Sequence, residues 1–433
     1  MTDWLRVSRG LFLTVVFLLM SDPVSAVSVE QKPEPQTVVL ISIDGFRHDY
    51  LEKYAPPYLN KLAQQGVRAD ALTPVYPSKT FPNHLSIVTG QYPVNHGIIH
   101  NKFYDRERDQ IYRIGMGAKD GSWIKGTPLW TLAEQQGVKA ATYFWPESDA
   151  LIQGRKPSWF YPYDKQKPYH ERIDQILTWL NMPKESKPRF ITGYFSLVDT
   201  KGHEYGPDSP ELAQAVNFVD QMIGRLMTGM EKAKINNVNL VIVSDHGMAL
   251  TKTSKLITQD DLPALNRNFK VITGNPHVLI YYKGTSKKSL NKIAQRFKKI
   301  ANNRFNVFTR ETMPDYWHYD NSPGIPDIIL ETVPPYMFGR GKPHGSVNRG
   351  THGFDPRTVQ DMGGLFLASG PAFVDETRIA AFENIHIYPL IADILGLTIS
   401  HHIDGKLSVL QAIRADADHG ANPASENKML KSK

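Results

Sequence analysis

The sequence predicts an α/β fold with a doubly wound, mostly parallel sheet. Short runs rich in β-branched residues alternate along the chain with segments whose apolar residues recur at helical spacing. The first run, residues 37–43, is apolar almost throughout, which is typical of a strand buried on both faces. Because strands and helices alternate, we expect parallel strands joined by crossover helices.

The remaining elements are predicted in order along the chain. Four further strands are expected at residues 140–144, 189–197, 240–244 and 364–368. The helices expected between strands lie at residues 58–65, 83–89, 128–136, 171–180 and 209–234. From about residue 251 to residue 338 the pattern changes to strands at 270–273, 277–282 and 327–333 with a basic amphipathic helix at 289–302. We interpret residues 27–414 as a single domain that carries an inserted α+β subdomain at about 251–338.

Composition limits the kinds of chemistry that this chain can perform. Apolar residues make up 41% of the 433 residues and charged residues 21%, as in ordinary globular proteins. There is no cysteine, which excludes thiolate metal sites and cysteine nucleophiles. The net charge of +7 is compatible with anionic ligands. However, no Lys/Arg block or RNA-binding motif indicates stable nucleic-acid binding.

The two ends of the chain differ from the rest. Residues 1–26 have the pattern of a signal peptide: Arg6 and Arg9 precede an apolar run at 11–20, and Val24-Ser-Ala26 forms a small-residue cleavage site. No later segment is apolar for long enough to span a bilayer, so no membrane contact is expected after cleavage. Residues 415–433 are charged and rich in small residues, and we predict that they are disordered.

Three acidic residues follow predicted strands. Asp44 comes directly after the first strand, Asp199 follows the strand at 189–197, and Asp245 follows the strand at 240–244. Ligands bind beyond the carboxyl ends of strands in open α/β sheets, so we expect these carboxylates to lie together at one edge. Three like charges in one crevice are unfavourable unless cations accompany them.

Three histidines are placed to join these acids. His203 stands four residues after Asp199, His246 follows Asp245, and His352 lies in the segment Gly350-Thr-His-Gly353. An isolated strand-end aspartate is more often a turn or cap residue, but the combination indicates a metal site. Imidazole and carboxylate ligands suit Zn²⁺ or a similar borderline ion. Two ions about 4 Å apart, as in two-metal phosphoryl-transfer sites, would balance the acids.

Thr80 is the candidate nucleophile. It precedes a helix predicted to begin near Asn83, and a helix N-terminus offers N–H groups and partial positive charge to a phosphate. A metal could activate the hydroxyl of Thr80 for attack. The alternative is that Thr80 only caps the helix.

Several segments resemble the nucleotide pyrophosphatase/phosphodiesterase family of the alkaline phosphatase superfamily. The matching segments, in family order, are Ile43-Asp-Gly-Phe-Arg47, Pro77-Ser-Lys-Thr-Phe-Pro-Asn-His84, Gly97-Ile-Ile-His-Asn-Lys-Phe-Tyr-Asp105, Trp123-Ile-Lys-Gly-Thr-Pro-Leu-Trp130, Phe144-Trp-Pro146, Asp199-Thr-Lys-Gly-His-Glu-Tyr-Gly-Pro207, Ser244-Asp-His-Gly-Met248, Gly350-Thr-His-Gly353 and Phe382-Glu-Asn-Ile385. Any one of them is weakly specific, whereas the ordered set is highly specific. The chain resembles the compact bacterial members of the family, and this resemblance implies an alkaline phosphatase-like fold and a periplasmic location.

The resemblance implies two zinc ions per chain. One ion would be held by Asp199, His203 and His352. The other would be held by Asp44, Asp245, His246 and the hydroxyl of Thr80.

The resemblance also implies roles around the substrate. Asn101 and the backbone N–H of Thr80 would stabilise a non-bridging phosphate oxygen. Phe81 and Tyr163 would sandwich a nucleobase. The segment around Tyr163 aligns only loosely with the family, so a packed surface aromatic is the alternative for that residue.

The implied activity is hydrolysis of nucleotide phosphodiester and pyrophosphate bonds. It would proceed through a phosphothreonine intermediate on Thr80 and release a nucleoside 5′-monophosphate. A choline-phosphodiester, phosphonate or phosphomonoester hydrolase could use the same metal ligands, because sequence alone does not separate an aromatic cage from a base clamp. A protein that binds a phosphate ligand without turnover is the alternative from another class. The sequence does not determine the oligomeric state.

Overall fold

The computed structural model describes residues 36–320, 322–341 and 347–415. The predicted signal peptide, residues 1–26, lies outside the described residues, and so does the predicted disordered tail from residue 416 onward. Among the helices of the described residues, none combines the length and the apolar character that crossing a membrane requires.

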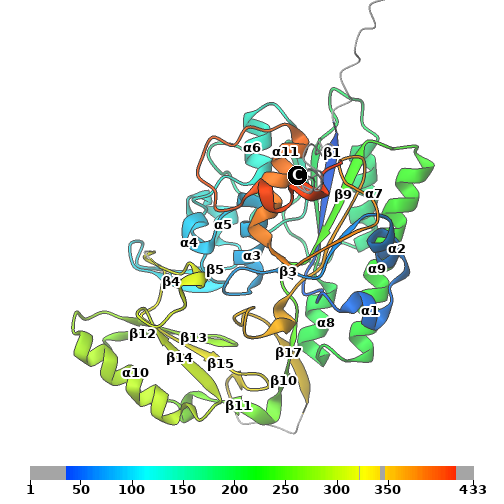
Figure 1. The fold of residues 1–433 in the computed structure, drawn as a ribbon. Helices are drawn as coiled ribbons and strands as arrows, with labels where there is room; N and C mark the ends of the chain where they lie inside the picture. The colour runs from blue at the N-terminus through cyan, green and yellow to red at the C-terminus, as the bar shows by residue number, and fades with distance from the viewer. Residues whose placement is uncertain (1–35, 321, 342–346, 416–433) are drawn as a thin grey trace, which may run out of the picture. The chain divides into compact units, whose positions relative to one another are not determined.

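The main sheet has eight strands among the described residues, in the order β19-β2-β18-β9-β1-β8-β6-β7 (Figure 1). In that order the strands are β19 Thr377–Ile379, β2 Val67–Ala69, β18 Phe366–Ser369, β9 Val238–Val243, β1 Thr37–Ile43, β8 Phe190–Phe195, β6 Ala140–Tyr143 and β7 Trp159–Phe160. The central strand β1 pairs in parallel with both β8 and β9. Only β18 runs antiparallel to its neighbours, so the sheet is mostly parallel, as predicted.

Helices cover both faces of this sheet. Side chains of β1 alternate between two cores: Val38 and Leu40 belong to one, whereas Val39 and Ile41 belong to the other. The first core is closed by α3 Thr80–Thr89, α6 Leu129–Gln135 and α11 Ile387–Leu395. The second core is closed by α2 Pro57–Gln65, α7 Tyr169–Leu180 and α9 Pro210–Lys232. The two helix groups lie on opposite sides of β1 and β9 in Figure 1, which confirms the doubly wound arrangement.

The structure departs from the predicted elements in identifiable ways. The helix expected at 83–89 begins at Thr80, because proline is tolerated in a first turn whose N–H groups have no partner within the helix. Strands β2, β7 and β19 have two or three residues each, which is too short to produce an apolar run. The predicted strand at 364–368 is present as β18 but runs antiparallel.

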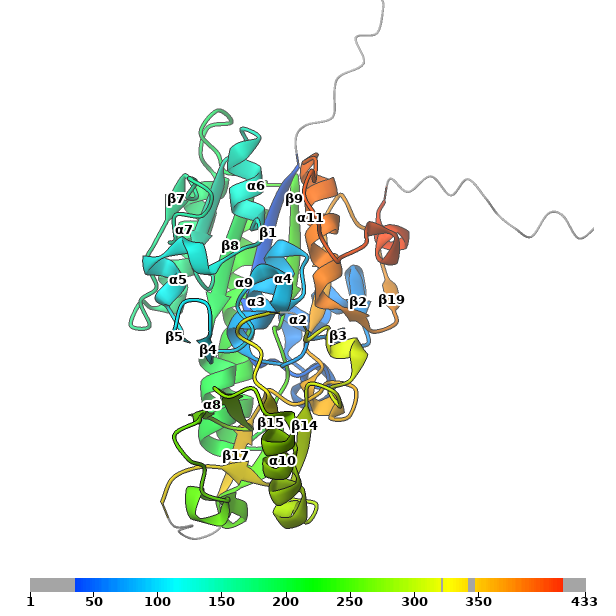
Figure 2. The same cartoon turned by 90° about the vertical axis from the view of Figure 1, so that its left-hand side faces the viewer.

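A second sheet lies within residues 251–338, and we call this stretch the inserted lobe. Its antiparallel strands occur in the order β12-β13-β15-β14, with one helix on one face (Figures 1 and 2). These elements are β12 Phe269–Thr273, β13 His277–Tyr282, α10 Lys287–Ala301, β14 Phe305–Thr309 and β15 Ile328–Thr332. We propose that this lobe is a subdomain inserted in the larger domain.

Other elements lie outside these two sheets. They are α1 Tyr50–Tyr54, β3 Leu72–Thr73, α4 Pro93–His96, β4 Lys102–Asp105, β5 Gln110–Arg113, α5 Met116–Lys119, α8 Leu197–Tyr205, β10 Ala249–Lys252, β11 Leu256–Ile257, η3 Gln259–Asp261, β16 Met337–Phe338, β17 Asn348–Thr351, β20 Phe382–Glu383 and η7 Leu407–Val409.

Candidate functional site

The three predicted acids meet at the carboxyl edge of the main sheet. Asp44 directly follows β1, Asp245 lies two residues beyond β9, and Asp199 is in the first turn of α8, which begins just after β8. Because β8 and β9 flank β1, the three strand ends are adjacent. The backbone N–H of Asp199 donates to the carbonyl oxygen of Asp44 over 3.0 Å. The sheet therefore brings together carboxylates that are far apart in sequence.

Gly45 permits the close approach of two of these chain segments. Its φ angle is +71°, in the left-handed region that glycine adopts most readily. A Cβ atom at this position would lie 2.8 Å from the Cα atom of Asp199. Any side chain here would push the β1 and α8 segments apart.

All three predicted histidines have one ring nitrogen fixed by a backbone carbonyl. The Nδ1 atom of His203 lies 2.8 Å from Gly350 O, that of His246 lies 2.9 Å from Gly247 O, and that of His352 lies 2.8 Å from Ser78 O. Because a carbonyl oxygen only accepts, each Nδ1 must carry the proton. A neutral ring in this tautomer has an unprotonated Nε2.

These Nε2 atoms face carboxylate oxygens. The Nε2 of His246 lies 2.9 Å from Asp245 Oδ2 and 3.5 Å from Asp44 Oδ1. Those of His203 and His352 lie 3.4 Å and 3.6 Å from Asp199 Oδ1. The three carboxylate oxygens involved are buried and accept no hydrogen bond.

Divalent cations fit this donor set. Burial lowers the pKa of His352 well below its usual value, so this ring is neutral at pH 7 and presents a lone pair. Lone pairs of imidazole nitrogen and carboxylate oxygen repel one another unless a cation lies between them. Nitrogen and oxygen ligands of this kind suit zinc.

The possible ligands form two groups that share a histidine. In the first group, ligand atoms of Asp44, Asp245 and His246 all lie within 4.8 Å of one another. The second group contains Asp199, His246 and His352 within the same limit. His203 is outside this group, although its ring centroid lies 5.0 Å from that of His352. Five of the expected ligands thus lie in these two groups, and His246 belongs to both.

The carboxylate cluster is electrostatically strained without cations. Burial raises the pKa of Asp44 well above its usual value, and the nearby charges of Asp245 and Asp199 raise it further. A hydrogen bond from the hydroxyl of Tyr194 to Asp44 Oδ2, 2.5 Å long, only partly offsets these effects. Positive charge at this position would keep Asp44 ionised.

Thr80 is the first residue of α3 and lies beside this cluster. Its Oγ1 atom is 3.3 Å from His246 Nε2, and the residue is partly exposed. The N-cap position of α3 belongs to Lys79, and no side chain caps the helix there. The interpretation that Thr80 only caps its helix is therefore wrong.

Asn101 is oriented by the same helix. Its Oδ1 accepts a hydrogen bond of 2.9 Å from the backbone N–H of Phe81. The acceptor side of the amide is therefore engaged, and its Nδ2 donor remains available beside Thr80. The first-turn N–H of Thr80 likewise has no acceptor within the helix.

The two predicted aromatic residues come from different segments of the chain. Phe81 is the second residue of α3, is partly exposed and packs against the first core. Tyr163 is 52% exposed, and its ring packs edge-on at 5.2 Å from Phe144 and 6.0 Å from Tyr194. The ring of Tyr163 contacts that of Tyr194, and the hydroxyl of Tyr194 donates a hydrogen bond to Asp44 of the acid cluster.

The chain matches the family described as "Type I phosphodiesterase / nucleotide pyrophosphatase" over residues 38–355. It belongs to this family. A venom phosphodiesterase from Naja atra is 33% identical over 420 residues, covering 94% of this chain and 50% of the relative. Human ectonucleotide pyrophosphatase/phosphodiesterase family member 1 is 34% identical over 392 residues, covering 88% of this chain and 42% of the relative.

A similar solved structure is that of murine ectonucleotide pyrophosphatase/phosphodiesterase 5, in an inactive form in complex with AMP. Its TM-score is 0.80 at 27% identity, and the match covers 88% of this chain and 100% of that chain. By contrast, the chain spans about half the length of the curated relatives that it matches. An alkaline phosphatase-like α/β fold is thus established for this member of the phosphodiesterase/nucleotide pyrophosphatase family.

His84 is a site residue that the sequence analysis missed. It is fully buried, its Nε2 lies 2.8 Å from Ser42 Oγ, and its Nδ1 lies 2.8 Å from Thr80 O. The same Nδ1 is 3.4 Å from Asp245 Oδ2. The four-residue spacing between Thr80 and His84 on one helix is the signal that could have revealed it.

Lys79 is a second missed residue. Its Nζ donates to the carbonyl oxygens of His352 and Asn275, at 2.6 Å each. Burial lowers the pKa of Lys79 to about 7. The Lys79 side chain therefore links the segment before Thr80 by hydrogen bonds to the loop of His352 and to the inserted lobe.

Proposed function

We propose that this chain is a metal-dependent phosphodiesterase and pyrophosphatase that acts on nucleotides through a nucleophilic Thr80. The observation that carries this proposal is the set of Nε2 lone pairs and unpaired carboxylate oxygens beside the Thr80 hydroxyl. Two zinc ions would suit these ligands. Asp199, His203 and His352 would hold one, and Asp44, Asp245, His246 and Thr80 would hold the other.

The ions would neutralise the carboxylates, lower the pKa of the nucleophile and stabilise charge on the leaving oxygen. The protein's own part begins with Thr80, whose deprotonated Oγ1 attacks the α-phosphorus. An oxygen–phosphorus bond forms, the bond to the leaving oxygen breaks, and a phosphothreonine results. Water then adds to the phosphorus, Thr80 Oγ1 leaves, and a nucleoside 5′-monophosphate is released.

Two donors are placed to stabilise the phosphoryl oxygens. The Nδ2 of Asn101 is held in position because Oδ1 is bonded to the N–H of Phe81. The N–H of Thr80 points from the N-terminus of α3, where partial positive charge favours phosphate. Both donors are fixed before substrate arrives, which is the condition for effective stabilisation of developing charge.

We expect Asn101→Ala to lower kcat about 10²–10³-fold, as the loss of one such donor does elsewhere. Asn101→Asp distinguishes catalysis from structure, because a carboxylate still accepts from Phe81 N–H but cannot donate to phosphate. Steady-state kinetics on a nucleotide phosphodiester should show Asp at least as impaired as Ala. Recovery of activity in Asn101→Asp would assign Asn101 a structural role only.

The nucleotide preference is supported by Phe81, which adjoins the nucleophile, and by the AMP complex of the murine relative. Tyr163, whose ring packs edge-on against Phe144, would complete the base clamp. Stacking on an aromatic ring is tolerant of base identity, so weak discrimination among bases is expected. We further propose export through residues 1–26 to a bacterial periplasm.

ATP should yield AMP and pyrophosphate, because a base held at Phe81 places the α-phosphate beside Thr80. Ion-exchange separation of products tests this, and ADP with phosphate as main products would refute it.

Phe81→Ala should reduce kcat/KM about tenfold, the value of one stacked base. Phe81→Tyr, which keeps the ring, is the control. Faster turnover of a choline phosphodiester than of any nucleotide would favour the alternative substrate class.

A further inference from the structure

The inserted lobe contains a cavity that is separate from the acid cluster. Its volume is about 600 Å³, within the range of about 300–1,000 Å³ that is usual for small-molecule sites. Its apolar lining comes from β12, β13, α10 and the segment around η3, and includes Leu262, Leu265, Phe269, Val278, Ile280 and Phe297. None of the predicted site residues lines it.

The cavity exists because one helix covers only part of one sheet face. α10 packs against β14, so that side of the sheet is closed. On β12, the alternate residues Phe269, Val271 and Thr273 point to the same face and line the cavity instead. Val271 remains 40% exposed, although the apolar surface around it continues the core of the lobe. Apolar surface of this kind is stabilised when an apolar ligand covers it.

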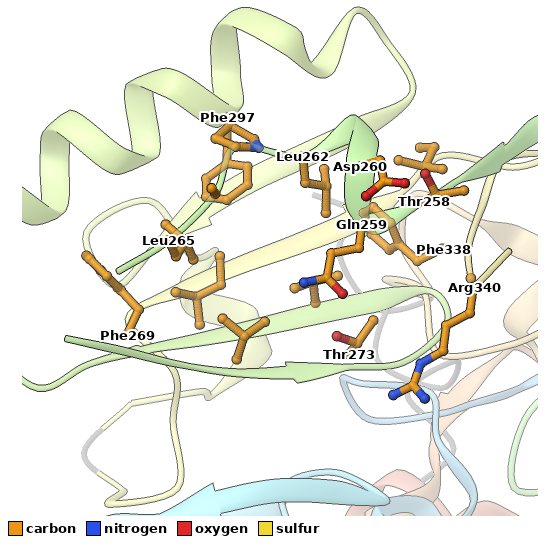
Figure 3. Close-up of a pocket in the computed structure, with 17 residues that line it drawn as sticks. Thr258, Gln259, Asp260, Leu262, Leu265, Phe269, Thr273, Phe297, Phe338 and Arg340 are labelled. Atoms are coloured by element: carbon orange, nitrogen blue, oxygen red, sulfur yellow. The ribbon is translucent and has the colours of Figure 1, made fainter. Parts of the chain in front are cut away.

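The polar groups gather at one end. Figure 3 shows Arg340 and Thr273 at the end opposite Leu265 and Phe269, with Gln259 between them. Within the described residues Arg340 forms no ion pair, and its side chain is exposed. An adjoining depression of about 520 Å³ is lined by Gln259 and Arg340 together with Asp260 and Asp261.

The surrounding charge is positive. No Asp or Glu occurs between Asp261 and Glu311, whereas this span contains eleven lysines and arginines. It comprises β12, β13, α10 and β14, which form most of the lobe. One acid, Asp260, does line the cavity, but Figure 3 places it away from Arg340. Asp261 is occupied, since it accepts from the N–H and hydroxyl of Thr258.

From these observations we infer that the cavity binds an amphiphilic anion, with its apolar body in the cavity and its carboxylate or phosphate group at Arg340. The apolar end determines the body, because Leu265 and Phe269 line it and Figure 3 shows Asp260 and Arg340 away from that end. At the other end Arg340, which forms no ion pair within the described part of the chain, determines the sign of the head group. The positive field of the lobe favours the same sign.

The test is calorimetric titration of the full chain with laurate, below its micelle concentration. We expect one saturable site per chain. Arg340→Gln should weaken laurate binding about tenfold, the usual value of a hydrogen bond to a charged group. Dodecanol should bind more weakly than laurate and should not respond to this substitution. Val271→Glu, at an exposed edge position, should also weaken laurate binding about tenfold or more because it adds like charge to the wall.

Two matched variants locate the effect. Val409→Glu changes a valine that is 44% exposed and lies outside the lobe, and Arg267→Gln removes an exposed charge from the acid-free span without touching the cavity. Both should bind laurate nearly as the unchanged chain does, and all variants should keep the rate of nucleotide hydrolysis. The inference is overturned if laurate shows no saturable binding. Equal effects of Arg340→Gln and Arg267→Gln, or equal binding of dodecanol, would overturn it as well.

Discussion

Thr80→Ala should abolish turnover while metal binding largely survives. The substitution removes the attacking oxygen, and loss of a nucleophile that acts in a concerted site lowers kcat by about 10⁴-fold or more. Six other side chains remain to hold the ions, so metal content should fall little. The fold should be unaffected, because the Thr80 side chain makes no cap hydrogen bond and alanine is a good helix former.

Thr80→Ser is the matched variant for this experiment. It keeps a hydroxyl at the same point on α3, so measurable hydrolysis should remain. Rates on a nucleotide phosphodiester, combined with metal analysis of the same samples, separate loss of the nucleophile from loss of the ions. Turnover of Thr80→Ala near that of the unchanged chain would remove Thr80 from the mechanism.

Much of the fold was predictable because burial on both faces leaves a visible mark. Strand β1 is apolar at successive positions since Val38 and Val39 enter different cores, and such runs are readily recognised. The short edge strands β2 and β19 have no comparable run, and pairing with distant segments defines them. Helix α3 begins at Thr80 and not near Asn83, because Pro82 is tolerated in the first turn of a helix.

The site was predictable to the extent that topology determines it. Parallel strands end at one edge, so Asp44, Asp199 and Asp245 could be grouped before any distance was known. The contacts that orient the ligands could not be predicted in this way. His352 depends on Ser78 O, and Asp44 depends on the hydroxyl of Tyr194, which are tertiary contacts without a sequence spacing.

We also expect a large loss of activity in Asp44→Asn, which changes the carboxylate cluster. Asparagine is neutral and weakens one ion position, so kcat/KM should fall more than about 100-fold, beyond the usual effect of losing a residue that only orients a ligand. Chelation should inactivate the unchanged chain, and zinc should restore it. When metal is absent, Asp44→Asn should be more stable than the unchanged chain, because the substitution removes one of three neighbouring negative charges.

The sign of that stability change follows from the raised pKa of Asp44. Since its pKa in the folded protein lies above the unfolded value of 3.8, the metal-free protein is most stable with Asp44 protonated and loses stability as pH rises above about 4. Metal-free Asp44→Asn escapes this loss, so its melting temperature should exceed that of the metal-free unchanged chain by several degrees at pH 7.5, and the two melting temperatures should converge near pH 4.

Zinc should reverse the order of the two melting temperatures, because an ion that binds the folded state stabilises the unchanged chain more than the variant. Asp220→Asn is the control. Asp220 is also buried with a raised pKa, but it accepts hydrogen bonds from the N–H groups of Tyr58 and Leu59 and is not one of the predicted ligands, so its response to zinc should match that of the unchanged chain. Thermal melts at both pH values, with chelator and with zinc, test all four expectations; equal stabilisation of Asp44→Asn and the unchanged chain by zinc would exclude Asp44 from the metal site.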